Sequence, residues 1–497
     1  MPRSIFIFLL LSMPCALRAQ VIEGLQLATQ PLPSGSRGLA MGGSLISSAD
    51  GIDALDFNPA AIAPLTSREI TISIFNRDHT STADFFNTSS TASLNAMSLS
   101  SLGIAAPFST TQGHLAVGIS FDRVRDYTSS YSFKAVNSTS SYFNTRGFLQ
   151  DFGNPTSLTN SQYLLQSNLA YALALTYGVP DSGAYMLTTP FNGGLEQSGT
   201  VTTEGGLNAV RIGAGIDIAE GISAGATLNI LFGSYNYTMD YQEKDINGVF
   251  ANDSVHLPPF GFQQANITTT LHQDQNGASI KFGLLMKRSI VNLGLTIETP
   301  EAMHISENSV QTGTSSFGTN GQFSSDMASD LPVYVQEYDI TTPFRFGAGA
   351  SIHLLGLTGS ASLSYADMSQ LRFSNGTFDM SAENDIARDS LRGVLAWQLG
   401  AEYTFSLLGL SVRAGYSFEP SPYKGDPTNY GVSAISGGLG FDLSKSVSLE
   451  AALRHAIYHT NHAIYNDVTP DGSPASANIY DDAVTRNDVS VTFSYRY

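Results

Sequence analysis

The chain has 497 residues and a net charge of −18, with 46 glycines and only 13% charged residues. Soluble enzymes carry about a quarter charged residues, so the composition argues against that class. The acidic balance argues against a nucleic-acid partner, which would need a basic surface. The single cysteine is Cys15, so disulfides, zinc–thiolate sites and cysteine nucleophiles are excluded from the chain that follows it.

Residues 1–19 have the pattern of a cleaved export signal. Arg3 precedes an apolar run from Ile5 to Leu11, and Ala-Leu-Arg-Ala ends the segment before Gln20. A membrane anchor would need about 20 apolar residues, but this run is interrupted at Ser12 and Pro14. We therefore expect a signal peptide at residues 1–19, and after it no segment is apolar enough for a membrane-spanning helix.

Residues 20–67 are too rich in glycine for a strand and too apolar for a free tail. They contain R-G-L-A-M-G-G at 37–43, Ala49-Asp50 and Asn58-Pro59-Ala60. Glycines allow close turns, and Asn-Pro marks a turn whose first residue is extended. We expect a compact plug, although an ordinary periplasmic extension would also fit these residues.

From residue 68 to the C-terminus, segments of about ten residues alternate apolar and polar side chains, which is typical of a transmembrane β-barrel. The last strand has Val489, Val491, Phe493, Tyr495 and Tyr497 on one face. Fourteen such strands are predicted: Glu69–Asn76, Leu94–Ala105, His114–Phe121, Val210–Ile218, Ala224–Phe232, Ser279–Met286, Val291–Ile297, Phe344–Leu354, Leu357–Tyr365, Leu395–Phe405, Leu410–Phe418, Val432–Leu443, Val447–Ile457 and Val489–Tyr497.

The connections between these strands alternate between short turns and long polar loops, as expected for the periplasmic and extracellular sides of an antiparallel barrel. The segment Tyr163–Tyr177 fits both a strand and a helix. We interpret it as a helix within an extracellular loop, and a barrel of sixteen strands is the alternative. A C-terminal strand that ends on an aromatic residue is typical of bacterial outer-membrane barrels, in which it carries the assembly signal.

If the apolar side chains face lipid, the opposite face of each strand points into the lumen. This rule places five basic and three acidic residues there. They are Arg211, Lys281, Glu298, Arg345, Glu402, Arg413, Glu450 and Arg454. Glu402 and Arg413 would be opposite each other across a hairpin, which favours a structural ion pair. Arg211, Arg345 and Arg454 have no obvious cross-strand acid, so these three and Lys281 are candidate ligand-binding residues.

The chain resembles the FadL-type family of outer-membrane transporters for hydrophobic compounds. The resemblance lies in the pattern R-x-L-A-M-G-G, A-D and N-P-A near the N-terminus, in Thr341-Thr342-Pro343-Phe344-Arg345, and in Arg413-Ala414-Gly415-Tyr416-Ser417. It covers essentially the whole chain after the predicted signal. It implies a 14-stranded barrel plugged by an N-terminal hatch.

The family resemblance also implies a function and two structural devices. Long-chain fatty acids or other apolar molecules would diffuse passively into the barrel and leave sideways into the membrane. The turn at Asn58, Pro59 and Ala60 would be the part of the hatch that gates the route. A kink in the third strand would make the lateral opening, and the alternation of that strand is lost at Asp122 and Arg123.

Other functions remain open from the sequence. Type IX protein secretion uses similar barrels as docking scaffolds, and a barrel hydrolase is a third alternative. We expect a non-enzymatic monomer in the outer membrane of a Gram-negative bacterium, with no cofactor and no bound metal. Its partners would be a hydrophobic ligand, outer-membrane lipid and lipopolysaccharide, and the barrel assembly machinery through the C-terminal strand.

Overall fold

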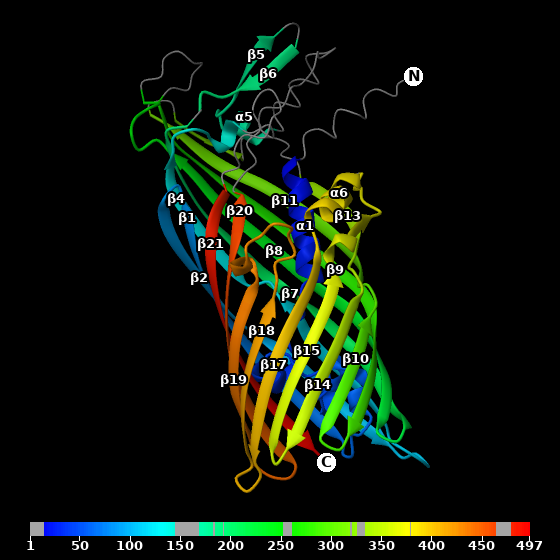
Figure 1. Cartoon of the computed structure of the whole chain (residues 1–497). Coiled ribbons are helices and arrows are strands. Elements are labelled where there is room, and N and C mark those ends of the chain that lie inside the picture. The colour runs from blue at the N-terminus through cyan, green and yellow to red at the C-terminus, as the bar shows by residue number, and fades with distance from the viewer. Residues whose placement is uncertain are drawn as a thin grey trace, which may run out of the picture.

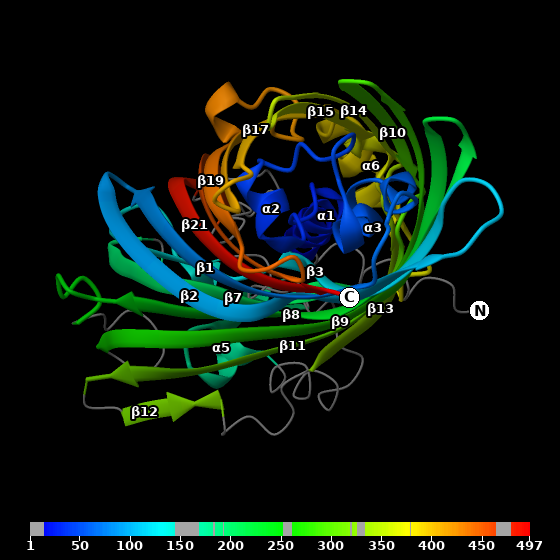
Figure 2. The same cartoon turned by 90° about the horizontal axis from the view of Figure 1, so that it is seen from below.

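The computed structural model describes residues 14–144, 168–181, 184–191, 193–251, 261–318, 321–325, 333–377, 379–463 and 479–497. Their main feature is a closed antiparallel β-barrel of fourteen strands that encloses the N-terminal segment (Figures 1 and 2). The chain runs from strand to neighbouring strand around the barrel, and the last strand pairs with the first, from Glu69 opposite Arg496 to Asp84 opposite Asp481.

Ten of the fourteen barrel strands are continuous. They are β1 (Glu69–Phe85), β2 (Thr88–Phe108), β7 (Leu195–Ala219), β8 (Ile222–Lys244), β9 (Phe262–Arg288), β17 (Gly393–Phe405), β18 (Leu410–Glu419), β19 (Val432–Asp442), β20 (Val447–Ala463) and β21 (Ile479–Arg496).

The other four strands are interrupted, and each is made of two pieces. These pairs are β3 (Leu115–Asp126) with β4 (Ser129–Asn137), β10 (Val291–Glu298) with β11 (Ala302–Phe317), β13 (Tyr334–Thr341) with β14 (Arg345–Leu354), and β15 (Leu357–Asp367) with β16 (Arg372–Ser374). The prediction of fourteen strands is confirmed, and all fourteen predicted segments overlap barrel strands.

The segment Tyr163–Tyr177 does not add strands to the barrel in its described part. Residues 163–167 lie outside the described residues. The following residues form the short helix α5 (Leu169–Ala172), and β5 (Tyr177–Asp181) and β6 (Ala184–Thr188) pair only with each other. The sixteen-strand alternative is therefore wrong. A further short strand, β12 (Gly321–Ser324), pairs with the end of β11.

One end of the barrel has short turns and the other has long connections, and we call these the turn end and the loop end. Near the turn end the outer surface is a band of exposed apolar side chains, among them Ile70, Ile72, Leu102, Ile104 and Phe493. The strands β7, β8, β9 and β11 continue well beyond this band toward the loop end (Figure 1). Within the band, apolar and polar side chains alternate along each strand, so one face of the strand meets lipid and the other faces the interior, as in other membrane barrels.

Residues 21–67 lie inside the barrel and form what we call the hatch. Its elements are the C-terminal part of α1 (Pro14–Ala28), α2 (Gly35–Ala40), η2 (Gly51–Asp53), α3 (Ala54–Phe57) and η3 (Pro59–Ile62). Seen from below, α1, α2 and α3 are surrounded by strands (Figure 2). None of the described helices is long and apolar enough to cross a membrane. The last described α-helix, α6 (Ser381–Ser390), packs beside α1 at the loop end (Figure 1).

The hatch lies very close to the barrel wall at a set of wall glycines. A β-carbon on any of these glycines would come closer than normal contact distance to a hatch atom. They are Gly103, Gly118, Gly213, Gly215, Gly225, Gly283, Gly294, Gly347, Gly349, Gly400, Gly415 and Gly438. The backbones of hatch and wall can approach this closely only because glycine has no side chain. We call this set the glycine belt, and it holds the hatch on ten strands of the barrel.

Candidate functional site: the cavity above the hatch

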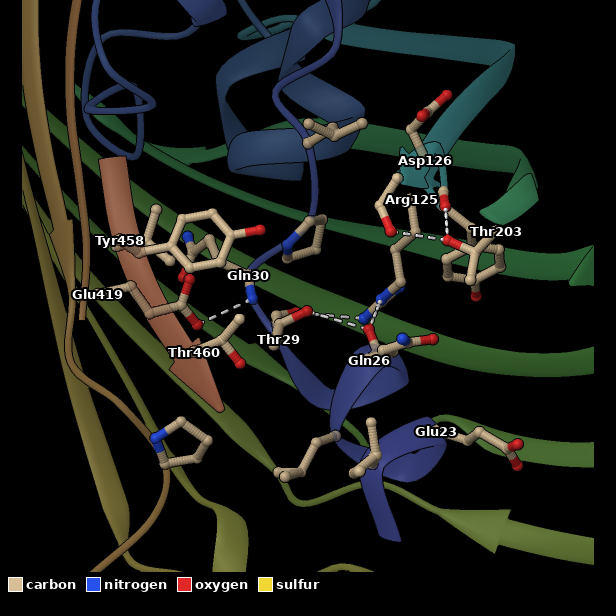
Figure 3. A pocket seen from close by; sticks show the side chains of 18 of the residues that line it. Glu23, Gln26, Thr29, Gln30, Arg125, Asp126, Thr203, Glu419, Tyr458 and Thr460 are labelled. Atoms are coloured by element: carbon tan, nitrogen blue, oxygen red, sulfur yellow. Dashed lines mark hydrogen bonds between the residues drawn. The ribbon is translucent and has the colours of Figure 1, made fainter. Parts of the chain in front are cut away.

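A cavity of about 1690 Å³ lies between the hatch and the loop end. Part of its lining comes from α1 and the segment after it, and the rest comes from inward-facing side chains of the wall (Figure 3). The aromatic side chains that line it include Tyr127, Tyr235, Phe418, Tyr430 and Tyr458. Aromatic rings offer large apolar surfaces, so the cavity can take a partly apolar molecule of drug size or larger.

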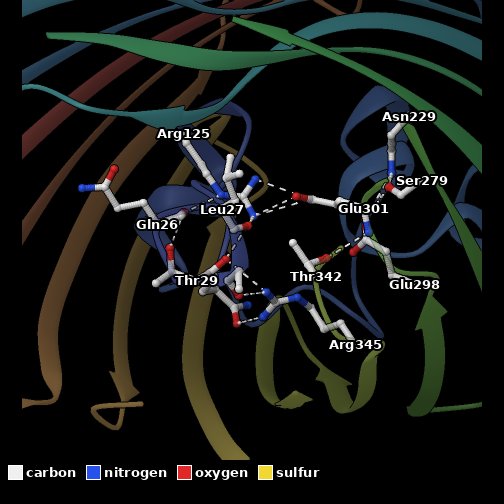
Figure 4. Close-up of polar contacts among 12 residues, drawn as sticks. Gln26, Leu27, Thr29, Arg125, Asn229, Ser279, Glu298, Glu301, Thr342 and Arg345 are labelled. Atoms are coloured by element: carbon white, nitrogen blue, oxygen red, sulfur yellow. Dashed lines mark hydrogen bonds and ion pairs between the residues drawn. The ribbon is translucent and has the colours of Figure 1, made fainter. Parts of the chain in front are cut away.

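Two arginines of the wall hold the C-terminal end of α1 (Figure 4). Arg345 donates to the carbonyl oxygens of Ala28 at 2.6 Å and Thr29 at 3.0 Å. Arg125 donates to the carbonyls of Gln26, Leu27 and Thr29. The last carbonyls of a helix have no partners within the helix and carry partial negative charge, which explains why cations gather there. Arg345, a predicted ligand-binding residue, is thus engaged by the hatch backbone.

Arg211 and Lys281 face a second part of the hatch. Arg211 makes ion pairs with Asp56 of the hatch at 2.7 Å and with Asp122 of β3 at 2.9 Å. Lys281 donates to the carbonyl oxygen of Asp56 at 2.7 Å and pairs with Glu298 at 3.2 Å. The expectation that Arg211 has no cross-strand acid is wrong, because Asp122 of the neighbouring strand β3 pairs with it, and Asp56 of the hatch is a second partner.

Arg454 also has an acidic partner, contrary to expectation. Its Nη1 lies 3.1 Å from Oδ2 of Asp488, and the same carboxylate receives Nε of Arg77 at 2.8 Å. Asp488 and Arg77 are both almost completely buried. A buried carboxylate shared by two guanidinium groups forms a brace between β1, β20 and β21.

The structure places Glu402 and Arg413 in contact, with Oε2 of Glu402 2.5 Å from Nε of Arg413. The same carboxylate binds Arg37 of the hatch at 3.0 Å, and Arg37 also binds Asp50 at 2.9 Å. Arg413 reaches Glu450 at 2.8 Å on its other side. The ion pair therefore joins the wall to the Arg37 motif of the hatch, which is a link that sequence patterns within the strands did not indicate.

The turn at Asn58, Pro59 and Ala60 is buried against β8 and β9. The Asn58 side-chain amide donates to the carbonyls of Ile46 at 2.8 Å and Leu284 at 3.1 Å. Its oxygen accepts a hydrogen bond from the Ala60 N–H at 3.1 Å, which caps η3. Both the amide nitrogen and the oxygen of the Asn58 side chain are thus engaged in fixing the turn.

The third strand breaks where its alternation was expected to fail. Pairing between β2 and β3 ends at Ser101 opposite Asp122, and the β3–β7 ladder shifts register between Arg123 and Arg125. Beyond this point β4 pairs with β7 and packs against β1 and β2 without a ladder to β2. Within the described residues, β2 from Thr88 to Ser100 therefore has an unpaired edge. The cavity lining includes the residues of this break, 124–129.

Arg486, like Arg77 and Arg125, is a cavity arginine that the sequence patterns did not indicate. Its guanidinium lies 5.1 Å from the ring centre of Tyr458, and its Nε is buried without a hydrogen-bond partner. No carboxylate lies within ion-pair distance of it among the described residues. The predicted last strand began at Val489, so Arg486 was assigned to a loop. Arg486 is two residues before Asp488, so the alternation of side chains along the strand would have indicated that both face the interior.

No three His, Cys, Asp or Glu side chains come together as a metal site in the described ranges. The arrangement is instead a cavity with aromatic walls, one unpaired guanidinium, a braced hatch below and a break in the wall beside it. These features suit binding or passage of a molecule.

A family model described as BamG matches residues 181–448, which is more than half of the chain. The chain belongs to the BamG family. None of the curated proteins matches it. Among solved structures, this BamG-family barrel is similar to a FadL homologue of Pseudomonas aeruginosa, with 14% identity and a TM-score of 0.55 over 94% of this chain and 99% of that one.

The barrel is also similar to the toluene transporter TodX of P. putida, with 12% identity and a TM-score of 0.52 over 93% of this chain and 98% of that chain. At these identities the similarity concerns the fold. The expected FadL-type architecture of this BamG-family protein, a plugged 14-stranded barrel, is confirmed.

Proposed function

We propose that the protein admits small hydrophobic molecules from outside the cell into its cavity and releases them sideways into the outer membrane. The observation that supports this proposal is the break between β2 and β3, because the cavity reaches the residues of the break and the β2 edge beside it is unpaired. Open strand edges do not occur where lipid surrounds a barrel unless something covers them. An edge that is left open so that a ligand can pass from the cavity into the membrane would explain this exception.

The polar end of an amphipathic ligand would meet Arg486. Long-chain fatty acids fit this description, since a carboxylate matches the donor fork of a guanidinium and the tail can lie on the aromatic walls. Apolar burial would hold the tail with about 25 cal/mol per Å². Toluene, the compound transported by the structurally similar TodX, represents a second class of ligand, which would not need the arginine.

The sideways exit avoids the hatch. The glycine belt and the buried ion pairs at Asp56 and Glu402 favour a hatch that stays in place during release. The turn at Asn58, Pro59 and Ala60 would move only if a molecule passed down to the periplasm. The partners in this proposal are the ligand, membrane lipid and lipopolysaccharide, and the barrel assembly machinery, with the protein as a monomer exported by a signal peptide.

The test is uptake of labelled oleate and of labelled toluene by liposomes that contain the protein. Two cysteines on neighbouring faces of β2 and β4, joined by a short bis-maleimide, should close the break and abolish uptake. The matched control is a cross-link between Thr82→Cys and Thr91→Cys, which are directly opposite on β1 and β2 and leave the break open. Uptake that equals that of empty liposomes, or that survives closure of the break, overturns the proposal.

A second candidate function is a scaffold subunit in barrel assembly or protein secretion. The family name points to barrel assembly. The loop end adds a second aromatic core around Phe133, Phe143, Phe191 and Phe262, which extends the protein well beyond the apolar band. Depletion of a scaffold would lower the amount of folded barrels in the outer membrane, whereas the β2–β4 cross-link would not. For a transporter, the cross-link would abolish uptake, and depletion would leave the amount of folded barrels unchanged.

A further inference from the structure

Two buried carboxyl groups meet at one phenol near the loop end. The hydroxyl of Tyr338 in β13 lies 2.7 Å from Oε2 of Glu23 in α1 and 3.3 Å from Oε2 of Glu307 in β11. Glu23, Glu307 and Tyr338 are 9%, 6% and 0% exposed. These residues are above the apolar band, and the ring of Tyr338 also belongs to the core that contains Val21 and Leu25 of α1.

The two acids do not have equal partners. Glu307 accepts hydrogen bonds from the side-chain amides of Gln273 and Gln336, both at 2.7 Å. These donors satisfy it as a carboxylate. Tyr338 has one hydroxyl proton to give. No basic side chain is within ion-pair distance of either acid in the described part of the chain. Two acids in this position can stay together only if they share a proton.

The burial of Glu23 is the main reason that its pKa is raised to about 8, and the charge of Glu307 raises it further. Another titratable group near Glu23 is Tyr235 of β8, which supplies no positive charge. Helix α6 packs against α1 and contains the buried Glu383 and the exposed Arg388, which pairs with Asp385 of its own helix. The arginines that bind α1, Arg125 and Arg345, are at its other end. The contact at Glu23 therefore depends on its proton, while the contact at the C-terminal end does not.

We propose that Glu23, Glu307 and Tyr338 form a proton-sharing latch that holds the Glu23 end of α1 across the cavity, and that loss of the proton releases this end. The latch does not depend on what the cavity binds. α1 would pivot about its C-terminal end, which the two arginines keep in place. Because α1 lines the cavity, release would enlarge the opening at the loop end.

The sign of the pH dependence follows from the proton balance. In the held state Glu23 keeps its proton up to about pH 8, whereas a released glutamate ionises near its ordinary value of 4.5. The latch is therefore strongest below pH 4.5. Between pH 4.5 and 8 one proton leaves on release, so the ratio of held to released α1 falls about tenfold per pH unit. Above pH 8 the latch has lost its proton in both states and the ratio stays constant.

The position of α1 can be measured directly with spin labels. The single cysteine, Cys15, lies within the predicted signal peptide, so labels at Ile22→Cys on α1 and Val335→Cys on β13 would report one distance, since both side chains are exposed. We expect a single short distance below pH 4.5, a longer population that grows as the pH rises toward 8, and no further change above pH 8. Glu23→Gln, which keeps a neutral side chain at every pH, should show the short distance throughout.

Glu243→Gln is the matched control. Glu243 is also a buried glutamate, but it binds Ser141, Gln197 and Tyr241, away from α1. It should leave the pH profile unchanged. The latch is overturned if Glu23→Gln has the same pH profile as the unsubstituted protein, or if the distance in the unsubstituted protein is constant over the whole pH range. If Glu23→Gln folds poorly, hydrogen exchange in the unsubstituted protein decides: as the pH rises toward 8, residues 21–25 should lose protection before residues 26–30. Uptake does not enter this test, so a failed latch is distinguishable from a failed transport proposal.

Discussion

The side-chain oxygen of Asn58 lies where a β-carbon on Gly283 would be placed. The hatch turn and strand β9 can therefore meet only because residue 283 has no side chain. The same close fit recurs around the glycine belt, but here it involves the turn that the family resemblance implies to be the gate.

We expect Gly283→Ala to displace the Asn58 turn and to destabilise the protein by about 1–3 kcal/mol, as is usual when a methyl group is forced into a packed interior. Urea unfolding in detergent measures the effect. The control is Gly359→Ala on β15, since a β-carbon at that position would have no neighbour within 4 Å. Equal stability of the two variants would mean that the turn can adapt without cost.

Asn58→Ala removes three hydrogen bonds and leaves buried backbone groups of the hatch without partners. Each such group costs about 1–3 kcal/mol, so the turn should loosen. If it gates a route through the hatch, single-channel recordings in planar bilayers will show larger or more frequent openings than the unsubstituted protein gives. Asn95→Ala, on an exposed face of β2, should not change the recordings. Closed channels in Asn58→Ala would argue against gating by this turn.

Replacing Arg125 and Arg345 by glutamine removes the two cations at the C-terminal end of α1. Such cations stabilise a helix end by about 0.3–2 kcal/mol each. We expect faster hydrogen exchange of the amides in residues 26–30, with little change in the barrel strands. Arg372→Gln is a suitable control because Arg372 is exposed on β16. Unchanged exchange would show that packing alone fixes this end.

The contact between Arg37 and Glu402 should carry measurable coupling. A double-mutant cycle with Arg37→Met and Glu402→Gln is expected to give about 0.5–3 kcal/mol, as for residues of one buried network. The comparison pair is Arg388 and Asp389 on α6, with side chains 63% and 71% exposed. Exposed pairs contribute about 0–1 kcal/mol, so a similar coupling for both pairs would contradict the role of Glu402 as an anchor of the hatch.

Arg486→Gln tests the polar end of the proposed cavity ligand. Hydrogen bonds to a charged group contribute about 1.5–3 kcal/mol, so uptake of oleate at low concentration should fall by roughly one to two orders of magnitude. Toluene has no carboxylate, and its uptake should be unaffected. A parallel loss for both compounds would mean that the substitution disturbs the cavity as a whole, and no loss for either would exclude Arg486 as a ligand contact.

Strand positions and sidedness could be predicted because alternation is a local property. The apolar parity of Val489 and its neighbours, carried back along the chain, correctly placed residues such as Arg211, Arg345 and Glu402 inside the barrel. The helix at Leu169–Ala172 was also consistent with the interpretation of its segment as a loop.

The partners of the inward residues could not be predicted in the same way. Arg37 and Glu402 are 365 positions apart, and Ser36 and Thr492 are 456 apart, yet both pairs are in contact. Neither strand pairing nor periodicity links a plug to the wall around it. The extension of strands past the apolar band was missed for a related reason. Polar residues beyond lipid do not alternate in hydrophobicity, so Arg486 and the whole of β11 were assigned to loops.

The glycine belt has a consequence for the order of assembly. We expect that a hatch in contact with the glycines of ten strands is difficult to thread into a finished barrel, because each contact of the belt is closer than a side chain would permit. The N-terminal segment, which is synthesised first, must already be seated when β21 meets β1. We therefore expect the sheet to close around the hatch, with the pairing of the first and last strands as the final step of folding.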